Sequence, residues 1–329
     1  GVANLQKISS NLIKEGKSKD TPVALISWAT RSNQRVITST LENVYETAVR
    51  ENVKPPTLIA VGDVVELRDK LNFFESKPLF GKNVIVTRSR TQSSSLVSKI
   101  SDLGGNPIEV PTIKIEKIEN NIALENEIKN IKDYTYLILT SKNAVDIFFD
   151  KLDEMDLDSR VLANLKVCAI GSATAKEIKN RGIKADIVPE KFVAEYLFEE
   201  LKDILKDSDK VLIPRAKNAR DFLVDKISEI CEVKEVHIYE TVLDDSKKDE
   251  VLDILNSGEA DYITFASSST VTNFVDIIGK ENIDKLNELK VISIGPITTQ
   301  TAKSLNINVY NEAEVSTIDG MIDSIMNDK

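Results

Sequence analysis

Three segments of this 329-residue chain recur further along it at nearly one distance. They pair as "KNVIVTRSRTQSSSLVSKISDLGG" (82–105) with "DKVLIPRAKNARDFLVDKISEI" (209–230), "YLILTSKNAVDIFFDKL" (136–152) with "YITFASSSTVTNFVDIIG" (262–279), and "KVCAIGSATAKEIKNRGIKADIV" (166–188) with "KVISIGPITTQTAKSLNINV" (290–309). The offsets are 127 residues from Arg88 to Arg215, 126 from Ser141 to Ser267 and 124 from Gly171 to Gly295. Chance explains three such agreements poorly, and the period is far too long for a solenoid. The sequence therefore predicts two copies of one structural half.

Each recurring unit opens with an apolar run of four to six residues, such as "NVIVT", "YLILT" or "VISIG", and continues with a helical pattern. Runs this short suit parallel strands that are buried on both faces. Val145, Phe148 and Phe149 show the helical spacing that follows a strand. The alternation predicts an α/β protein with two doubly wound parallel-sheet domains and right-handed crossovers.

Glycine and hydroxylated residues stand where several of the predicted helices begin. In open α/β sheets, ligands bind beyond the carboxyl ends of the strands, where the next helix presents unpaired N–H groups and its positive dipole end. Gly171 and Gly295 allow a close turn, and nearby serines and threonines add donors, so the turns indicate carboxylate or phosphate cradles. Ordinary N-capping is the simpler explanation for any single turn. Neither GxGxxG nor GxxxxGK[ST] occurs.

Composition narrows the class of partner. The net charge of −10 makes nucleic acid an unexpected partner, because phosphate binding needs a basic face. Two cysteines and one histidine do not make a typical zinc site, and no apolar run approaches the roughly 18 residues of a membrane span. Cys168 and Cys231 lie in apolar runs, which indicates buried free thiols. We expect a cytoplasmic protein of two or three domains with no metal and no membrane contact.

A series of short motifs, in one order over some 250 residues, resembles uroporphyrinogen-III synthase. The motifs are "VTRSRTQ", "TSKNAV", "AIGSATA", "PRAKNARDFL", "VHIYET", "FASSSTVTNF" and "IGPITTQTA". The resemblance implies two α/β domains joined by a two-stranded β linker, with strands "VPTIKIEKI" and "EVHIYETVL". It places one discontinuous domain at 79–115 and 243–329, and the other at 118–238.

The resemblance also implies a reaction without a cofactor. A synthase of this family closes hydroxymethylbilane, a linear tetrapyrrole with eight carboxylates, into uroporphyrinogen III, with inversion of ring D and loss of water. Tyr239 matches the tyrosine of the family's "YET" motif and is the expected catalytic residue, as a proton donor to the leaving hydroxyl. The alternative is a linker tyrosine whose ring covers the connection. His237 is expected to be structural.

The expected substrate-binding residues follow from the same motifs and from the internal repeat. Arg88 and Arg215 are twins in the repeat, and either could hold a carboxylate by a bidentate fork. For Arg215, a salt bridge to Asp221 or to another acid is an equal alternative. The complete set is Thr87, Arg88, Ser141, Asn143, Thr174, Arg215, Ser267, Ser268, Thr298 and Thr299, with Gly171 and Gly295 as backbone turns.

Residues 1–78 do not fit the repeat. "PPTLIAVGDVVELRDKLNFFE" and "DTPVALISWATRSNQRVITSTLENV" resemble the C-terminal end of uroporphyrinogen-III C-methyltransferase, an enzyme that uses S-adenosylmethionine. We therefore expect an N-terminal α/β fragment of a tetrapyrrole methylase, fused to the synthase and without methyltransferase activity. A homodimer through residues 1–78 is a further expectation, because methylases of this type pair. The alternative for this segment is a folding platform only.

Two other functions remain open at this point. A non-catalytic protein with two lobes that binds an anionic metabolite would share the helix-start cradles but would not need Tyr239. An active uroporphyrinogen-III methyltransferase would instead bind S-adenosylmethionine tightly.

Overall fold

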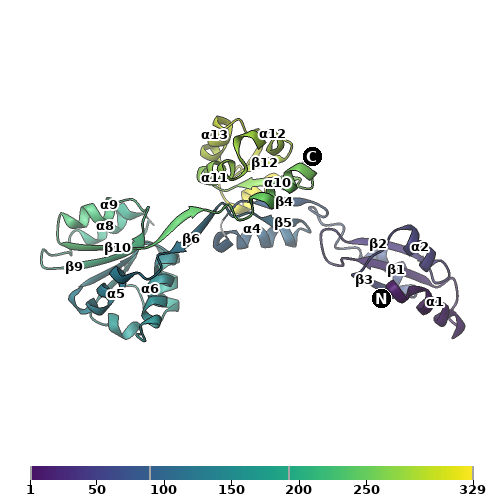
Figure 1. Cartoon of the computed structure of the whole chain (residues 1–329), viewed down its shortest axis with the longest axis horizontal. Helices are drawn as coiled ribbons and strands as arrows, with labels where there is room; N and C mark the ends of the chain where they lie inside the picture. Colours follow the sequence, from purple (N-terminus) through teal and green to yellow (C-terminus); the bar gives the residue numbers. More distant parts are fainter. Residues whose placement is uncertain (1, 89, 192, 328–329) are drawn as a thin grey trace. The chain divides into compact units, whose positions relative to one another are not determined.

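The computed structural model describes residues 2–88, 90–191 and 193–327 (Figure 1). The chain forms two compact units, one of residues 1–113 and 243–329 and the other of residues 114–242. The second unit is thus inserted into the first. Whether residues 1–78 form a separate domain, as the sequence predicts, stays a prediction. Among the described residues, no helix is long and apolar enough to cross a membrane.

The first unit contains a five-stranded parallel sheet in the order β13-β12-β11-β4-β5. Helices cover both of its faces. Alternate residues of β4 explain this, because Ile85 packs with α10, α11, α12 and α13, whereas Val84 and Val86 pack with α4 and α14. The bounds are β4 (Asn83–Val86), α4 (Arg90–Asp102), β5 (Asn106–Glu109), α10 (Lys248–Ser257), β11 (Tyr262–Phe265), α11 (Ser268–Ile278), η5 (Lys280–Asn282), α12 (Ile283–Leu286), β12 (Lys290–Ser293), α13 (Pro296–Ser304), β13 (Val309–Glu312) and α14 (Ile318–Met326).

The second unit contains a sheet in the order β6-β10-β9-β7-β8, in which β10, β9, β7 and β8 are parallel. It is also covered on both faces. Leu137 and Leu139 pack with α5, α6 and α7, whereas Tyr136 and Ile138 pack with α8 and α9. The bounds are β6 (Ile113–Lys117), α5 (Ile122–Lys129), η3 (Ile131–Asp133), β7 (Tyr136–Leu139), α6 (Lys142–Glu154), η4 (Ser159–Leu162), β8 (Lys166–Ala169), α7 (Ser172–Asn180), α8 (Ala194–Leu201), β9 (Lys210–Ala216), α9 (Phe222–Ser228) and β10 (Glu232–Leu243).

The two sheets share one strand order, which confirms the α/β class and the internal repeat. β5-β4-β11-β12 of the first sheet corresponds to β10-β9-β7-β8 of the second, with the repeated segments at matching places. An isolated parallel bridge from Cys168 to Ile187 takes the place that β13 has in the first sheet. In each sheet the chain winds in opposite directions from the central pair, so both are doubly wound.

The chain passes from the first unit to the second in β6 and returns to the first in β10. The Ile118 N–H donates to the Ile238 carbonyl at 3.1 Å, and the Asp244 N–H donates to the Thr112 carbonyl at 3.1 Å. Residue numbers fall on one strand as they rise on the other, so the two strands run antiparallel. This is the two-stranded β linker that the motifs predicted.

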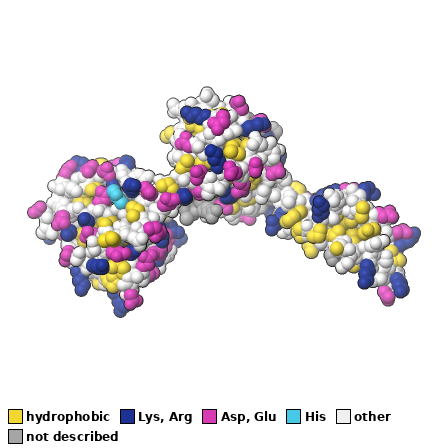
Figure 2. Space-filling view, in the orientation of Figure 1, with side chains coloured by type: hydrophobic (Ala, Val, Ile, Leu, Met, Phe, Trp, Pro, Cys, Tyr) yellow, Lys and Arg dark blue, Asp and Glu magenta, His cyan; other side chains and the backbone are white. Residues whose placement is uncertain are grey.

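The N-terminal part contains an antiparallel three-stranded sheet in the order β2-β1-β3. Val23 and Leu25 of β1 are fully buried against α1 and α2. The opposite face carries Ile26 and Leu58, and Leu58 is 62% exposed. Figure 2 shows hydrophobic side chains gathered over this part. The bounds are η1 (Val2–Asn4), α1 (Leu5–Lys14), β1 (Pro22–Ser27), β2 (Arg35–Thr40), α2 (Val44–Arg50), β3 (Thr57–Val61), η2 (Asp63–Leu67) and α3 (Arg68–Leu71).

Candidate functional site

The strand order locates a candidate site in the second unit. From the central pair β7 and β9, the chain continues to β8 on one side and to β10 on the other. Doubly wound sheets bind ligands at such a switch point, beyond the carboxyl ends of the strands. Ser141 follows β7 there, and Arg215 and Ala216 end β9. The topology therefore brings these two predicted residues to one edge of the sheet.

A cavity of about 180 Å³ lies at this switch point. The residues that line it include Thr140, Ser141, Arg215, Ala216, Arg220 and Tyr239. Three of the residues singled out from the sequence therefore share one cavity, although they are up to 98 positions apart in the chain. The strand register explains why Tyr239 is one of the three, because Tyr239 of β10 is the partner of Ala216 on β9, which also lines the cavity.

Ser141 and Tyr239 are in direct contact. The Ser141 Oγ lies 2.9 Å from the Tyr239 Oη. The same Oγ accepts a hydrogen bond of 3.0 Å from the Ala144 N–H, so Ser141 is the N-cap of α6. Its capping role is the one expected of serine before a helix. Tyr239 is only 5% exposed and its ring packs in the core beneath the sheet edge, which fixes the position of the phenol oxygen.

Arg215 is engaged by groups of this chain. It is 3% exposed and forms ion pairs with Asp221 and with Glu235, and its Nη1 donates to the Arg220 carbonyl at 2.7 Å. The pair with Asp221 is the alternative that the sequence left open. A substrate carboxylate would have to displace one of these acids, so a binding role for Arg215 stays a prediction. The contacts give Arg215 a direct part in shaping the cavity wall.

Glu235 is a residue that the sequence reasoning did not name. Its Oε1 contacts both the Arg215 guanidinium and the His237 Nε2, the latter at 2.7 Å. The repeat contains the signal that would have found it. Glu109 precedes Glu235 by 126 residues, and the registers correspond: Glu109 is opposite Val86 on β4, and Glu235 is opposite Ile213 on β9.

A family model described as uroporphyrinogen-III synthase HemD matches residues 94–323, well over half of the chain. The chain belongs to the uroporphyrinogen-III synthase family. The predicted resemblance to this family is confirmed.

Named relatives agree with both parts of the chain. The porphyrin biosynthesis protein HemD of Ruminiclostridium josui is 38% identical over 327 residues, covering 99% of this chain and 64% of that protein. The chain thus spans less than two thirds of that relative. A uroporphyrinogen-III C-methyltransferase of Bacillus subtilis is 33% identical over 182 residues, 55% of this chain and 37% of that protein. Similarity to methyltransferases covers the N-terminal region, as predicted.

A solved structure supports the synthase fold. A crystal structure of a mutant uroporphyrinogen III synthase from Thermus thermophilus matches with a TM-score of 0.50 and 16% sequence identity. The match covers 74% of this chain and 97% of that one. At this identity the likeness concerns the fold alone, and it agrees with the two-sheet architecture above.

The synthase repeat places a second group of predicted residues at the switch point of the first unit. Thr87 and Arg88 follow β4, and Ser267 and Ser268 follow β11, the strand beside it. Ser267 is the N-cap of α11, and the Ser268 Oγ donates to the Ile297 carbonyl at 3.3 Å. Thr87 is 1% exposed, and its Oγ1 donates to the Thr264 carbonyl at 2.7 Å. Arg88 is half-buried.

The remaining predicted residues lie at the starts of three helices. Gly171 and Gly295 precede α7 and α13 with extended backbone, and a Cβ on Gly295 would lie 2.5 Å from the Ser316 Oγ. The Thr299 Oγ1 lies 2.6 Å from the Ser293 Oγ and donates a hydrogen bond to the Glu312 carboxylate of β13, so this hydroxyl is directed into the protein. In the first turns of α6, α7 and α13 lie Asn143, which is half-buried, and Thr174 and Thr298, which are both buried.

The two cysteines of the chain, Cys168 and Cys231, are free and buried. Burial raises the pKa of the Cys168 thiol to about 12 and also raises the pKa of Cys231. Neither thiol lines the cavity at the switch point. Within the described part of the chain, no group of three or more His, Cys, Asp and Glu side chains could hold a metal ion.

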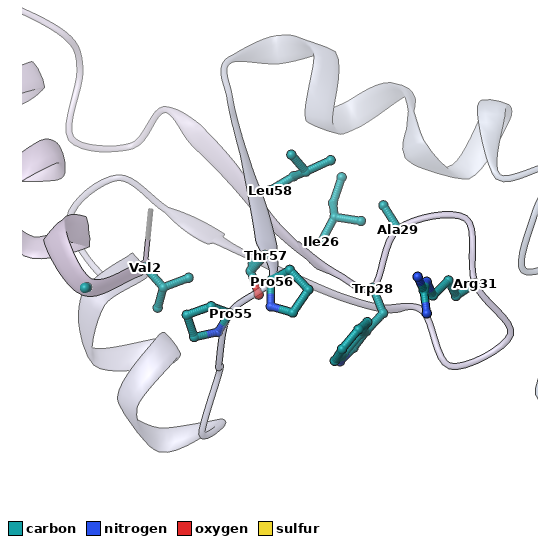
Figure 3. Close-up of a pocket in the computed structure, with 10 residues that line it drawn as sticks. Val2, Ile26, Trp28, Ala29, Arg31, Pro55, Pro56, Thr57 and Leu58 are labelled. Carbon is teal, nitrogen blue, oxygen red and sulfur yellow. The ribbon is translucent and has the colours of Figure 1, made fainter.

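The N-terminal part carries larger cavities on the exposed face of its sheet. One of about 490 Å³ is lined by Ile26, Trp28 and Leu58, among others, and the Arg31 guanidinium lies 5.5 Å from the centre of the Trp28 ring (Figure 3). A second of about 320 Å³ is lined by Ala24 and Ala60, among others. Both cavities have mostly apolar walls, which suits the contact of this face with a further apolar surface.

Proposed function

We propose that this chain closes hydroxymethylbilane to uroporphyrinogen III with inversion of ring D and release of one water. Membership of the synthase family supports the reaction class. The observation that carries the site is the meeting of Ser141, Arg215 and Tyr239 around one cavity at a topological switch point. The cavity of about 180 Å³ is smaller than typical ligand pockets of about 300–1,000 Å³, so it receives one end of the linear substrate.

The chemistry begins at the hydroxymethyl end of the substrate. Tyr239 donates a proton to the hydroxyl oxygen as the C–O bond breaks, so that water departs and a protonated azafulvene remains beside the Tyr239 phenolate. The azafulvene carbon then bonds to ring D and forms a spiro intermediate. Opening and reclosure of this intermediate invert ring D, and the carbon that forms the last bond loses its proton to the Tyr239 phenolate, so that the net change is the release of one water. The protein contributes mainly by holding the flexible chain in the productive arrangement.

Local donors, rather than the overall field, hold the eight carboxylates, because the net charge of −10 opposes an anionic substrate. In this proposal Arg88 supplies a charged fork, and the starts of α6, α7, α11 and α13 supply N–H groups. The hydroxyls of Ser267 and Ser268 are half-buried at the start of α11, where they can add hydrogen bonds. No cofactor takes part in the scheme, and the two buried free thiols suit a reducing cytoplasm.

The test is the isomer of the product. Fresh hydroxymethylbilane closes without an enzyme to uroporphyrinogen I, so the type III isomer reports catalysis. We expect type III to dominate when the chain is present, measured by chromatography after oxidation. Type I alone from folded protein would refute the synthase and would leave a protein that binds the tetrapyrrole without closing it.

We further propose that residues 1–78 hold two copies of the chain together through the exposed face of β1, β2 and β3. The exposed apolar side chains support this, since a soluble protein rarely leaves so large an apolar face uncovered. Leu58→Glu places a charge on this face, whereas Val49→Glu places one on α2, where Val49 is 64% exposed. Light scattering should give a dimer mass for the wild type and for Val49→Glu, and 36.6 kDa for Leu58→Glu. A monomeric wild type would contradict the pairing.

A further inference from the structure

Ser141 takes part in two hydrogen bonds with one oxygen. The Oγ accepts from the Ala144 N–H at 3.0 Å and lies 2.9 Å from the Tyr239 Oη. A serine hydroxyl has one O–H to donate and two lone pairs to accept with. One lone pair is occupied by the helix N–H. The question is which of the two hydroxyls donates in the contact between Ser141 and Tyr239.

The electrostatics of α6 favour donation by Ser141. α6 has 13 residues, and Ser141 lies at its positive end, where the Ala144 N–H points toward the Oγ. A hydroxyl proton is most stable when it points away from that positive end, and the Tyr239 Oη is the acceptor within reach. Tyr239 then accepts from Ser141, and its own O–H is left to point into the cavity that both residues line.

A series of linked hydrogen bonds also makes the final hydroxyl, here that of Tyr239, a stronger donor. Each bond from the Ala144 N–H to Ser141 and from Ser141 to Tyr239 polarises the next one in the low-dielectric interior. Tyr239 is 5% exposed, so bulk water competes little for its oxygen. The phenol therefore becomes a better donor toward a hydroxyl in the cavity than an isolated phenol would be.

The internal repeat provides a comparison within the same chain. Ser267, the twin of Ser141, caps α11 in the same way, but its Oγ has Ser269 as its other partner, at 3.0 Å. The offset of 126 residues that relates Ser141 to Ser267 and Glu109 to Glu235 places Ile113 at the position of Tyr239. The cap is thus common to both halves, whereas the phenol beside it belongs to the second unit alone.

We propose that Ser141 is a positioning residue that acts through Tyr239, by donating to the phenol oxygen and turning the tyrosine proton toward the substrate. This inference rests on the proposed synthase function. It differs from the role of direct substrate binder that the motif predicts for Ser141. The two roles make different predictions, because a positioning residue has no effect once the phenol hydroxyl is gone.

The variants separate capping from donation. Ser141→Thr keeps both the cap and the donor and should keep kcat within about twofold of the wild type. Ser141→Asp keeps the cap, but an ionised carboxylate only accepts, so it turns the Tyr239 proton away from the cavity. We expect kcat at saturating substrate to fall about a hundredfold, to the value of Tyr239→Phe, with the urea midpoint retained. Thr317→Ala removes the cap of α14 and is the control for simple cap loss, with kcat unchanged.

The decisive measurement is a double-mutant cycle. Adding Ser141→Asp or Ser141→Ala to Tyr239→Phe should change kcat no further, and Ser141→Ala should lower the urea midpoint less in the Tyr239→Phe background than alone. Additive losses of kcat would overturn the proposal and make Ser141 a direct binder. If the wild type forms no type III product, the proposed function fails. The unfolding cycle would then still show whether the two hydroxyls are coupled.

Discussion

The buried arginine at the switch point allows a sharp test of what stabilises the second unit. Arg215→Met keeps most of the side-chain volume but leaves Glu235, whose side chain is 26% exposed, without its arginine partner and with His237 as its remaining contact. Removing one member of a buried ion pair costs about 3–5 kcal/mol. Asp221 is 71% exposed and adds little, since exposed pairs contribute about 0–1 kcal/mol. Because Glu235 keeps some contact with water, we expect a loss near the lower bound, about 3 kcal/mol of unfolding free energy.

Hydrogen exchange measured by mass spectrometry on peptides of β9 and β10 reports this loss within the second unit. Exchange of individual peptides assigns the loss to the second unit, which a urea transition of the whole chain does not do by itself. The fluorescence of Trp28, the single tryptophan, reports the N-terminal part and should not change. Arg220→Met removes an exposed pair with Glu195 and should cost less than about 1 kcal/mol.

A second substitution tests the electrostatic cause. Arg215→Met with Glu235→Gln removes the unpaired charge and should recover about half of the loss, because a neutral amide is cheaper to bury than a carboxylate. The reasoning fails if Arg215→Met costs less than about 1 kcal/mol, or if Glu235→Gln brings no recovery.

Three further outcomes are expected. Gly295→Ala should lower the unfolding free energy by about 1 kcal/mol, because its Cβ meets the Ser316 Oγ, and Ser316→Ala should restore it in urea unfolding. With its pKa raised to about 12, the Cys168 thiol should stay unreactive toward a thiol reagent at pH 8. Above about pH 8.5 the thiol ionises in the unfolded chain but not in the folded one, so the free energy of unfolding should fall as pH rises from there. The pKa of the Asp150 carboxyl is lowered, mainly by its hydrogen bond from Lys117, so this carboxyl should stabilise the fold above its unfolded pKa and lose that effect as pH falls through its folded pKa. Lys117→Met should therefore weaken the fall of the urea midpoint at acidic pH.

The architecture could be predicted because it depends on local patterns. The run "YLIL" lacks a charged or strongly polar side chain, and the structure buries all four of its residues, Tyr136–Leu139. The repeat then required two sheets of one topology, and the family motifs located the linker strands. All of these signals lie within short stretches of the sequence, where periodicity and turn chemistry are readable.

The details of the site depend on neighbours that no local pattern reveals. Arg215 could face a ligand or an acid, and the register of β9 against β10 places Glu235, 20 residues away, within its reach. The hydroxyl of Thr87 is likewise directed to the Thr264 carbonyl because β4 and β11 are neighbours. The binding roles of Thr87, Arg88 and the helix-start threonines therefore stay predictions. The contact between Ser141 and Tyr239 arises in the same way, from three-dimensional proximity alone.

The turnover of Tyr239→Phe tests most directly whether the cavity of the second unit performs the ring closure. Tyr196→Phe is the matched control, because Tyr196 is 41% exposed on α8 and lies outside the cavity lining. We predict that Tyr239→Phe lowers kcat about a hundredfold with little change in KM, at the weak end of the effects of a positioned acid, while Tyr196→Phe behaves as the wild type. Wild-type turnover by Tyr239→Phe, with type III still the product, would contradict the account and move the chemistry away from this cavity.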